Sequence, residues 1–175
     1  MPLNTAYVAI GSNVGDRLAQ MCRALELLVA DGTVHILGTG RIYQNRAIGM
    51  GEADPFLNSV IQVETSLCPE ALLDLCLSVE DQLGRVRTGV WAPRTMDLDV
   101  LIYGTVEQVT ERLHLPHPRM QERDFVMLPL ADLAPDLEVH GQRVCVWADS
   151  LGSDELQVFE HPLWTPGGKS YSVKE

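Results

Sequence analysis

The sequence predicts an α+β domain in which the elements follow the order β-α-β-β-α-β. Apolar runs of strand length occur four times, and two stretches of helix length carry apolar residues at the three- and four-residue spacing of one helix face. The chain of 175 residues has the size of one domain, and its composition, 46% hydrophobic and 21% charged, is that of a folded protein. We therefore expect one packed domain over residues 1–160.

The first strand and helix are delimited by turn-forming residues. Residues 6–10 read as a buried strand, and Gly11 begins a turn-prone group. A helix is expected over residues 16–30, with its apolar residues on one face, and Gly32 follows its end. This pattern gives the first β-α unit.

Apolar runs bounded by turn-forming residues also predict the next two strands and the second helix. Residues 34–43 and 56–64 read as strands, separated by a long loop that contains glycine. A second helix is expected over residues 69–83, because proline suits its first position and Gly84 suits its end.

The last strand, Thr95 to Tyr103, carries two carboxylates on one face. Successive strand side chains alternate between faces, so Asp97 and Asp99 project together. The opposite face should be buried, with Met96, Leu98, Val100 and Ile102. The resulting order is that of a ferredoxin-like βαββαβ fold, a four-stranded sheet with its helices packed on one face.

A C-terminal extension follows this unit. It contains a stretch rich in histidine and proline at residues 114–118 and a small helix around residues 125–133. From Gly152 the sequence loses its periodicity, and we expect residues 161–175 to form a flexible tail. His35 and His140 read as ordinary surface or core histidines.

Composition limits the partners. A formal net charge of −11 argues against a general affinity for nucleic acid, and a single-stranded RNA binder would also need an aromatic-basic strand motif that is absent. The four cysteines form no C-x-x-C pair and stand among apolar residues, which suits reduced core cysteines. There is no apolar stretch of membrane-spanning length and no signal-peptide pattern at the N-terminus, so we expect a cytoplasmic protein with no membrane partner.

The segment from Arg85 to Asp99 concentrates groups that bind phosphate and metal. It holds three arginines, a tryptophan and the two alternating carboxylates. Guanidinium groups match phosphate oxygens bidentately, and Mg²⁺ binds through one or two carboxylates together with substrate phosphates. A pair of aspartates alone is often only the solvated face of a strand, and a few arginines alone are often only a surface loop. The two together favour a magnesium-polyphosphate site.

Several motifs together resemble the 6-hydroxymethyl-7,8-dihydropterin pyrophosphokinase family of folate biosynthesis. They are A-I-G-S-N at the first strand, F-L-N at the third, R-x-R, W-x-P-R-T-x-D-L-D, P-H-P-R-M and R-x-F. The match runs from about Ala6 to Pro135, and the W-x-P-R-T-x-D-L-D motif is highly specific. The resemblance implies a ferredoxin-like fold and transfer of the pyrophosphoryl group of ATP to the hydroxymethyl group of the pterin, releasing AMP.

The resemblance also implies roles for residues on the nucleotide side. Asp97 and Asp99 would bind two Mg²⁺ ions, and they would form the catalytic set together with Arg85 and Arg94. The residues expected to bind ATP are Arg85, Arg87, Trp91, Arg94, Arg112, His117 and Arg123, of which Arg87 and Trp91 lie on a loop that closes over the site.

On the pterin side the resemblance implies an aromatic sandwich. Phe56 and Phe125 would enclose the ring, Asn58 would hydrogen-bond it, and Asn45 and Ile48 would contact it from the loop after the second strand. That loop lacks the prolines usual in the family and carries Arg46, so pterin affinity is the property that we expect to differ.

Two interpretations compete. The chain is either this enzyme, acting on its small-molecule substrates as a monomer or weak homodimer, or a non-catalytic nucleotide- or pterin-binding module on the same fold. Formation of AMP discriminates between them.

Overall fold

The structure is a computed structural model that describes residues 3–12, 16–45, 56–83, 96–152 and 156–159. The predicted tail, residues 161–175, lies outside this part of the chain. The elements in chain order are β1 (Asn4–Ser12), α1 (Arg17–Val29), β2 (Val34–Thr39), β3 (Ile42–Asn45), β4 (Leu57–Thr65), α2 (Pro69–Gln82), β5 (Asp97–Tyr103), β6 (Gln108–Val109), β7 (His114–Leu115), the 3-10 turn η1 (Met120–Glu122), α3 (Asp124–Leu133), β8 (Glu138–Val139), β9 (Gln142–Arg143), α4 (Val144–Leu151) and β10 (Leu156–Phe159).

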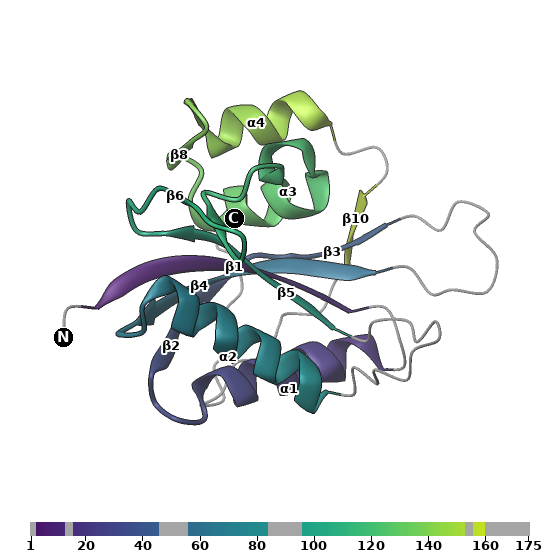
Figure 1. Ribbon diagram of the computed structural model, residues 1–175. Helices are drawn as coiled ribbons and strands as arrows, with labels where there is room; N and C mark the ends of the chain where they lie inside the picture. Colours follow the sequence, from purple (N-terminus) through teal and green to yellow (C-terminus); the bar gives the residue numbers. More distant parts are fainter. Residues whose placement is uncertain (1–2, 13–15, 46–55, 84–95, 153–155, 160–175) are drawn as a thin grey trace.

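A six-stranded antiparallel sheet forms the centre of the molecule (Figure 1). Its strands run in the order β10-β3-β4-β1-β5, and β2 pairs with the other half of β4. β1 lies between β4 and β5, and β5 stands at the edge of the described sheet. The predicted β-α-β-β-α-β order is present with its second strand divided into β2 and β3. This division and β10 give the described sheet six strands, so the predicted number of four is wrong.

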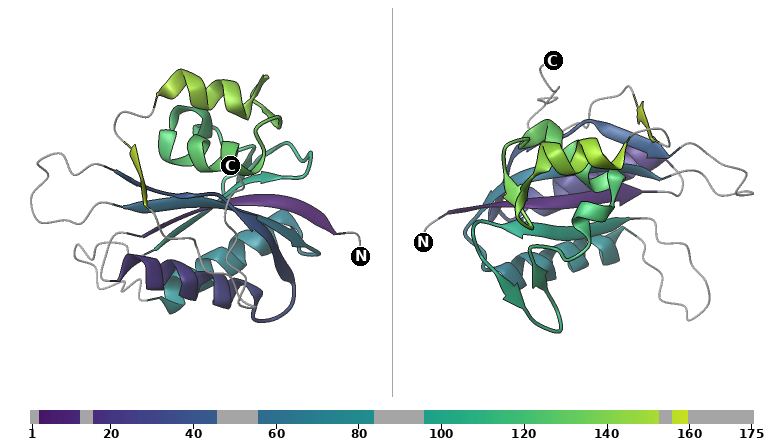
Figure 2. Two further views of the ribbon diagram at one scale, coloured as in Figure 1. Left: turned by 180° about the vertical axis from the view of Figure 1, so that it is seen from behind. Right: turned by 90° about the horizontal axis from the view of Figure 1, so that it is seen from above.

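Helices cover both faces of the sheet. Figure 1 shows α1 and α2 together below it and α3 and α4 together above it, and the view from behind in Figure 2 agrees. Two apolar cores result, one between the sheet and the helices α1 and α2, and a second between the sheet and the helices α3 and α4. The helices of the βαββαβ unit share one face as predicted, and the C-terminal extension adds a second helical layer on the other.

The bounds of the first predicted helix and the start of the second agree with the structure, and Gly84, predicted to follow the second helix, lies outside the described residues. Asp16 precedes α1 and accepts a hydrogen bond from the backbone N–H of Ala19 at 3.1 Å, which satisfies one of the free amides at the helix start. Pro69 opens α2, where its missing N–H costs nothing. Met21 and Leu25 of α1 are fully buried against the sheet.

A bulge in β5 changes which face its last residues occupy. Val8 of β1 pairs with Val100 and Tyr7 pairs with Ile102, so Leu101 has no partner of its own on β1. Val100 packs in the core under α1 and α2, whereas Ile102 packs in the core under α3 and α4. The prediction that Ile102 shares the face of Met96, Leu98 and Val100 is therefore wrong, because the extra residue reverses the alternation.

The predicted strand 34–43 is divided into β2 and β3 at Gly40. Both pieces pair with β4, and the break lies where α3 crosses the sheet. A Cβ at residue 40 would lie 2.4 Å from the carbonyl oxygen of Pro129 in α3, so only glycine allows this approach. The stretch after Gly152, which has no periodic pattern, contains one further strand, β10, which pairs antiparallel with β3.

Asp132 ties α3 to β3. Its side chain is 7% exposed, and its carboxylate accepts hydrogen bonds from Arg41 Nη2 at 2.8 Å, from the Arg41 backbone N–H at 3.1 Å and from the Tyr43 hydroxyl at 2.9 Å. Burial, followed by the nearby carboxylate of Asp132, raises the pKa of Tyr43, so its hydroxyl remains a donor. This cluster fixes the helix that carries Phe125 at its N-terminal end.

The cysteines are all free. Cys76 is buried in α2, and burial, followed by the nearby Glu80 and Asp99, raises the pKa of its thiol to about 12. Cys68 is exposed just before α2, which contradicts its expected apolar surroundings; as the residue before Pro69 it lies ahead of the helix and its apolar stripe.

Among the described helices, none is long and apolar enough to cross a membrane.

Candidate active site

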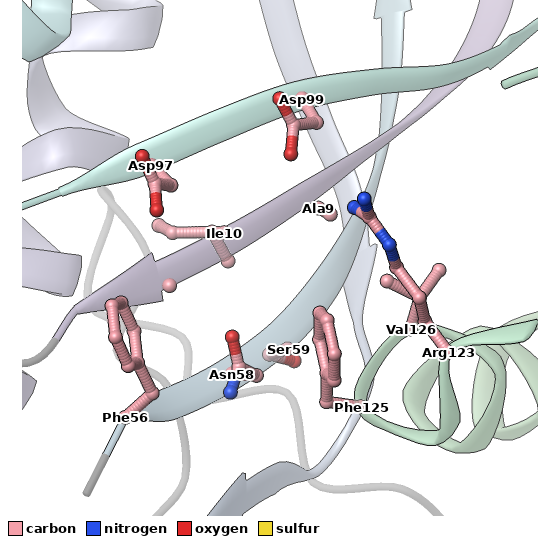
Figure 3. Close-up of a pocket in the computed structure, with 11 residues that line it drawn as sticks. Ala9, Ile10, Phe56, Asn58, Ser59, Asp97, Asp99, Arg123, Phe125 and Val126 are labelled. Carbon is pink, nitrogen blue, oxygen red and sulfur yellow. The ribbon is translucent and has the colours of Figure 1, made fainter. Parts of the chain in front are cut away.

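A cavity of about 330 Å³ opens between the ends of β1, β4 and β5 and the start of α3 (Figure 3). It brings together residues that are far apart in the sequence, from β1, β4 and β5 of the βαββαβ unit and from α3 of the extension. The lining residues are Ala9, Ile10, Gly11, Phe56, Asn58, Ser59, Asp97, Asp99, Arg123, Phe125 and Val126.

Two aromatic side chains flank the polar floor of this cavity. Phe56, just before β4, and Phe125, at the start of α3, stand on either side of Asn58, as Figure 3 shows. Flat rings placed in this way suit a flat heterocycle, and the amide between them offers both a donor and an acceptor. The predicted grouping of Phe56, Asn58 and Phe125 is present in the structure.

Gly11 determines where the Asn58 amide lies. The two residues are paired in the ladder between β1 and β4, and Asn58 is 9% exposed. A Cβ on residue 11 would lie 2.7 Å from Asn58 Oδ1, closer than such atoms approach. The missing side chain therefore provides the space that the amide occupies.

Asp97 and Asp99 project from the same side of β5 into the cavity (Figure 3). Leu98 between them is 2% exposed in the core, so the predicted alternation holds here. In the described residues no group of three or more His, Cys, Asp or Glu side chains is arranged to hold a metal. A two-carboxylate donor set of hard oxygens leaves coordination positions for phosphate oxygens and water, and it therefore fits Mg²⁺ bound together with a phosphate-containing ligand.

Glu80 of α2 supports this part of β5. Its carboxylate is buried, 4% exposed, and Glu80 Oε2 accepts the backbone N–H of Leu98 at 2.8 Å. That N–H belongs to the residue between the two aspartates, so the buried carboxylate helps to hold their spacing. Glu80 is not among the site residues predicted from the sequence, although a carboxylate on the apolar face of a predicted helix is a usable signal.

A second cavity of about 300 Å³ shares one lining residue with the first. That residue is Asp99, so the two cavities meet there. The remaining lining residues are Leu73, Val100, Thr110, Glu111, Arg112, Leu113, His114, His117 and Pro118. Arg112 pairs with Asp74 of α2.

His117 is held by its backbone and by its ring. Its N–H donates to the carbonyl of Leu101 at 2.8 Å, and its Nδ1 accepts the N–H of Arg119 at 3.2 Å. Because Nδ1 is an acceptor, the neutral ring carries its proton on Nε2. Burial, followed by the nearby positive charge of Arg123, lowers the pKa of His117.

Arg123 completes the described part of the site. It stands at the residue before α3, its guanidinium carbon is 5.9 Å from the centre of the Phe125 ring, and its side chain lines the first cavity (Figure 3). A positive charge is thereby placed on the wall of the cavity that also holds the two aspartates.

Some predicted site residues fall outside the described part of the chain. They are Ile48, Arg85, Arg87, Trp91 and Arg94. Asn45 ends β3, where its backbone faces Leu156 of β10. The structure thus brings together Phe56, Asn58, Asp97, Asp99, Arg123 and Phe125 in one cavity, and Arg112 and His117 with Asp99 in the next.

Solved structures share this fold. A chain of Plasmodium falciparum HPPK-DHPS crystallised with SDX-DHP superposes with a TM-score of 0.66 over 89% of this chain, at 12% identity. An HPPK-DHPS in complex with substrates gives 0.64 over 86% of this chain, also at 12% identity. This chain spans 47% and 43% of those longer proteins, so at this identity the likeness concerns the fold alone.

Sequence relatives are closer. A 2-amino-4-hydroxy-6-hydroxymethyldihydropteridine pyrophosphokinase of Methylorubrum extorquens is 42% identical over 142 residues, covering 81% of this chain and 90% of the relative. The protein of the same name from Bacillus subtilis is 40% identical over 160 residues, covering 87% and 96%. The family model for 7,8-dihydro-6-hydroxymethylpterin-pyrophosphokinase (HPPK) matches residues 7–135. The resemblance inferred from the motifs is thereby confirmed, and this chain belongs to the HPPK family of pyrophosphokinases.

Proposed function

We propose that this chain transfers the pyrophosphoryl group of ATP to the hydroxymethyl group of 6-hydroxymethyl-7,8-dihydropterin, giving AMP and the dihydropterin diphosphate for folate biosynthesis. The observation that carries the proposal is the pair of cavities that meet at Asp99, one walled by aromatic rings and the other lined by Arg112 and His117. A bond forms between the hydroxymethyl oxygen and the β-phosphorus. The bond from that phosphorus to the oxygen that remains on AMP breaks, and the hydroxyl proton passes to water.

The first cavity is the proposed pterin site. Phe56 and Phe125 would stack on the two faces of the ring, and the Asn58 amide would pair with its polar edge. Backbone contacts from Asn45 and Ile48 remain part of the proposal.

The second cavity, together with Arg123, is the proposed ATP site. The guanidinium groups of Arg112 and Arg123 and the Nε2–H of His117 are donors directed to phosphate or sugar oxygens. The proposal extends this set to Arg85, Arg87, Trp91 and Arg94, of which Arg85 and Arg94 act with Asp97 and Asp99 in catalysis.

Asp97 and Asp99 are the proposed ligands of two Mg²⁺ ions. When bound, Mg²⁺ would neutralise the phosphate charge and make the β-phosphorus more open to attack. Both carboxylates line the first cavity, Asp99 also lines the second, and Glu80 bonds to the residue between the two aspartates.

Catalysis by these residues rests on placement. Phosphoryl-type transfer passes through a loose transition state, in which orientation and charge neutralisation supply most of the acceleration. Phe56, Asn58 and Phe125 would orient the alcohol, and the arginines and His117 would hold the phosphates in line with it. We propose that no side chain acts as an essential general base.

The deciding experiment incubates the protein with ATP, Mg²⁺ and 6-hydroxymethyl-7,8-dihydropterin and identifies the nucleotide product. AMP formed in equal amount to the dihydropterin diphosphate is the expected result. Binding of both substrates without AMP supports the non-catalytic module instead, and ADP as the product indicates transfer of a single phosphoryl group. A Phe125→Ala variant should raise the KM for the pterin more than the KM for ATP, since Phe125 lines only the first cavity.

The assembly and location of the protein complete the proposal. We propose a monomer or a weak homodimer, which light scattering of the purified protein over a range of concentrations tests. A cytoplasmic location is supported by the four free cysteines, which suit a reducing compartment.

A further inference from the structure

His140 contacts the loop that carries His117. His140 Nε2 lies 2.7 Å from the carbonyl oxygen of His117, and because a carbonyl only accepts, this ring nitrogen is the donor. The N–H of the same residue, His117, donates to Leu101 of β5. The backbone of His117 is therefore held on one side by the edge of the sheet and on the other by a histidine ring.

The turn that presents His140 is itself fixed. His140 and Gly141 join β8 to β9, with Glu138 opposite Arg143 and Val139 opposite Gln142. Both turn residues have positive φ, 49° at His140 and 82° at Gly141. Such turns favour Asn-Gly, and histidine is among the residues other than glycine that are enriched at positive φ.

The hairpin is anchored to the second core. Val139 is 3% exposed, and its carbonyl accepts the indole N–H of Trp147 in α4 at 2.8 Å. The imidazole of His140 thus extends from this anchored hairpin to the carbonyl oxygen of His117. Its position does not depend on the proposed substrates, because the support lies in the core under α3 and α4.

We propose that His140 is a positioning residue for nucleotide binding. Its ring N–H fixes the peptide of His117, and so directs the Nε2–H of His117 into the second cavity before ATP arrives. A donor held in place in advance loses less conformational freedom on binding than a mobile one. This inference rests on the proposed function in so far as the second cavity takes ATP.

Two substitutions separate the ring from the turn. His140→Asn and His140→Gly both suit a positive φ, so each keeps the backbone while removing the imidazole. We expect the KM for ATP to rise about three- to tenfold, the size of effect that the loss of one hydrogen bond has on an equilibrium. The KM for the pterin and the melting temperature should stay at the values of the unchanged protein.

Two further variants serve as controls, one that keeps a hydrogen-bond donor at residue 140 and one at a histidine far from the site. His140→Gln restores a side-chain N–H donor and should recover part of the lost ATP affinity. His35→Asn removes an exposed histidine of β2 and should leave both KM values unchanged. In ¹⁵N-edited spectra of the ligand-free protein, the ring resonances of His117 should shift in His140→Gly and remain unshifted in His35→Asn.

The outcomes are distinct. An unchanged ATP KM in both ring-free variants overturns the positioning role, as does an equal rise in both KM values accompanied by a lower melting temperature. If the unchanged protein forms no AMP, the proposed function fails while the spectra and a calorimetric titration with Mg²⁺-ATP still test His140. Unshifted His117 resonances and unchanged ATP affinity in that titration then reject the inference on their own.

Discussion

Replacing Gly11 by alanine should damage pterin binding and leave the fold intact. The new Cβ would lie 2.7 Å from Asn58 Oδ1 but 3.6 Å from both the Leu57 carbonyl oxygen and Phe56 Cδ1. The last two distances are ordinary contacts, so the strain falls on the Asn58 amide. This amide is the end of a side chain, and it can turn away without moving the strands.

The magnitude follows from the hydrogen bonds lost. An amide that has turned away leaves polar atoms of the buried pterin without partners, which costs about 1–3 kcal/mol. At about 1.4 kcal/mol per factor of ten, pterin affinity should weaken roughly 5- to 150-fold. Mg²⁺-ATP affinity should change little, because Gly11 does not line the second cavity.

Calorimetric titration with 6-hydroxymethyl-7,8-dihydropterin, in the presence of a non-hydrolysable ATP analogue, measures the effect directly. Gly32→Ala is the matched control: Gly32 has a φ of 80°, and a Cβ added there would meet no atom within 4 Å, so alanine costs about 1 kcal/mol of stability through its backbone alone. Its pterin affinity should be unchanged. A Gly11→Ala protein that binds pterin within twofold of the unchanged protein refutes the reasoning about the Asn58 amide.

Three further predictions concern the charged and titrating groups. Asp97→Ala should lower turnover roughly a thousandfold or more at an unchanged melting temperature, whereas Asp149→Ala on the exposed side of α4 should keep full turnover. Asp132→Ala should lower the free energy of unfolding by about 3 kcal/mol in urea titrations, because it leaves the buried Tyr43 hydroxyl without its acceptor; a loss below about 1 kcal/mol contradicts the role given to this cluster. Since burial lowers the pKa of His117 from 6.5, the unfolded chain takes up this proton first as the pH falls, so stability should decline below pH 6.5, and His117→Gln should remove that part of the decline.

The local pattern of the sequence predicts most of the fold. The alternation through Asp97, Leu98 and Asp99, the bounds of α1 and the start of α2 at Pro69 depend on neighbours a few positions away, and the structure confirms them. The bulge at Leu101 does not follow from such a pattern, because an extra residue in one strand is defined by its pairing with another. β10 escapes prediction for the same reason, since a four-residue strand is stabilised by its partner β3 more than by its own composition.

The residues of the site also fall into two groups, those that the sequence identifies and those that only the structure reveals. Motifs that resemble the family identify Phe56, Asn58 and Phe125, and the structure places them around one cavity. The contacts of the supporting residues do not follow from the sequence: the position of Glu80 on the apolar face of α2 marks it as unusual, but its bond to Leu98 and that of His140 to His117 join distant segments. Such contacts are set by tertiary packing, which no local window of sequence contains.

The place of Asp99 in the walls of both cavities has a thermodynamic consequence. Any ligand that neutralises this carboxylate from one cavity also changes the electrostatic potential in the other, so the two binding equilibria are linked. Linkage is reciprocal: the factor by which the nucleotide changes affinity for the pterin equals the factor by which the pterin changes affinity for the nucleotide. The shared residue Asp99 thus couples the filling of one cavity to the filling of the other.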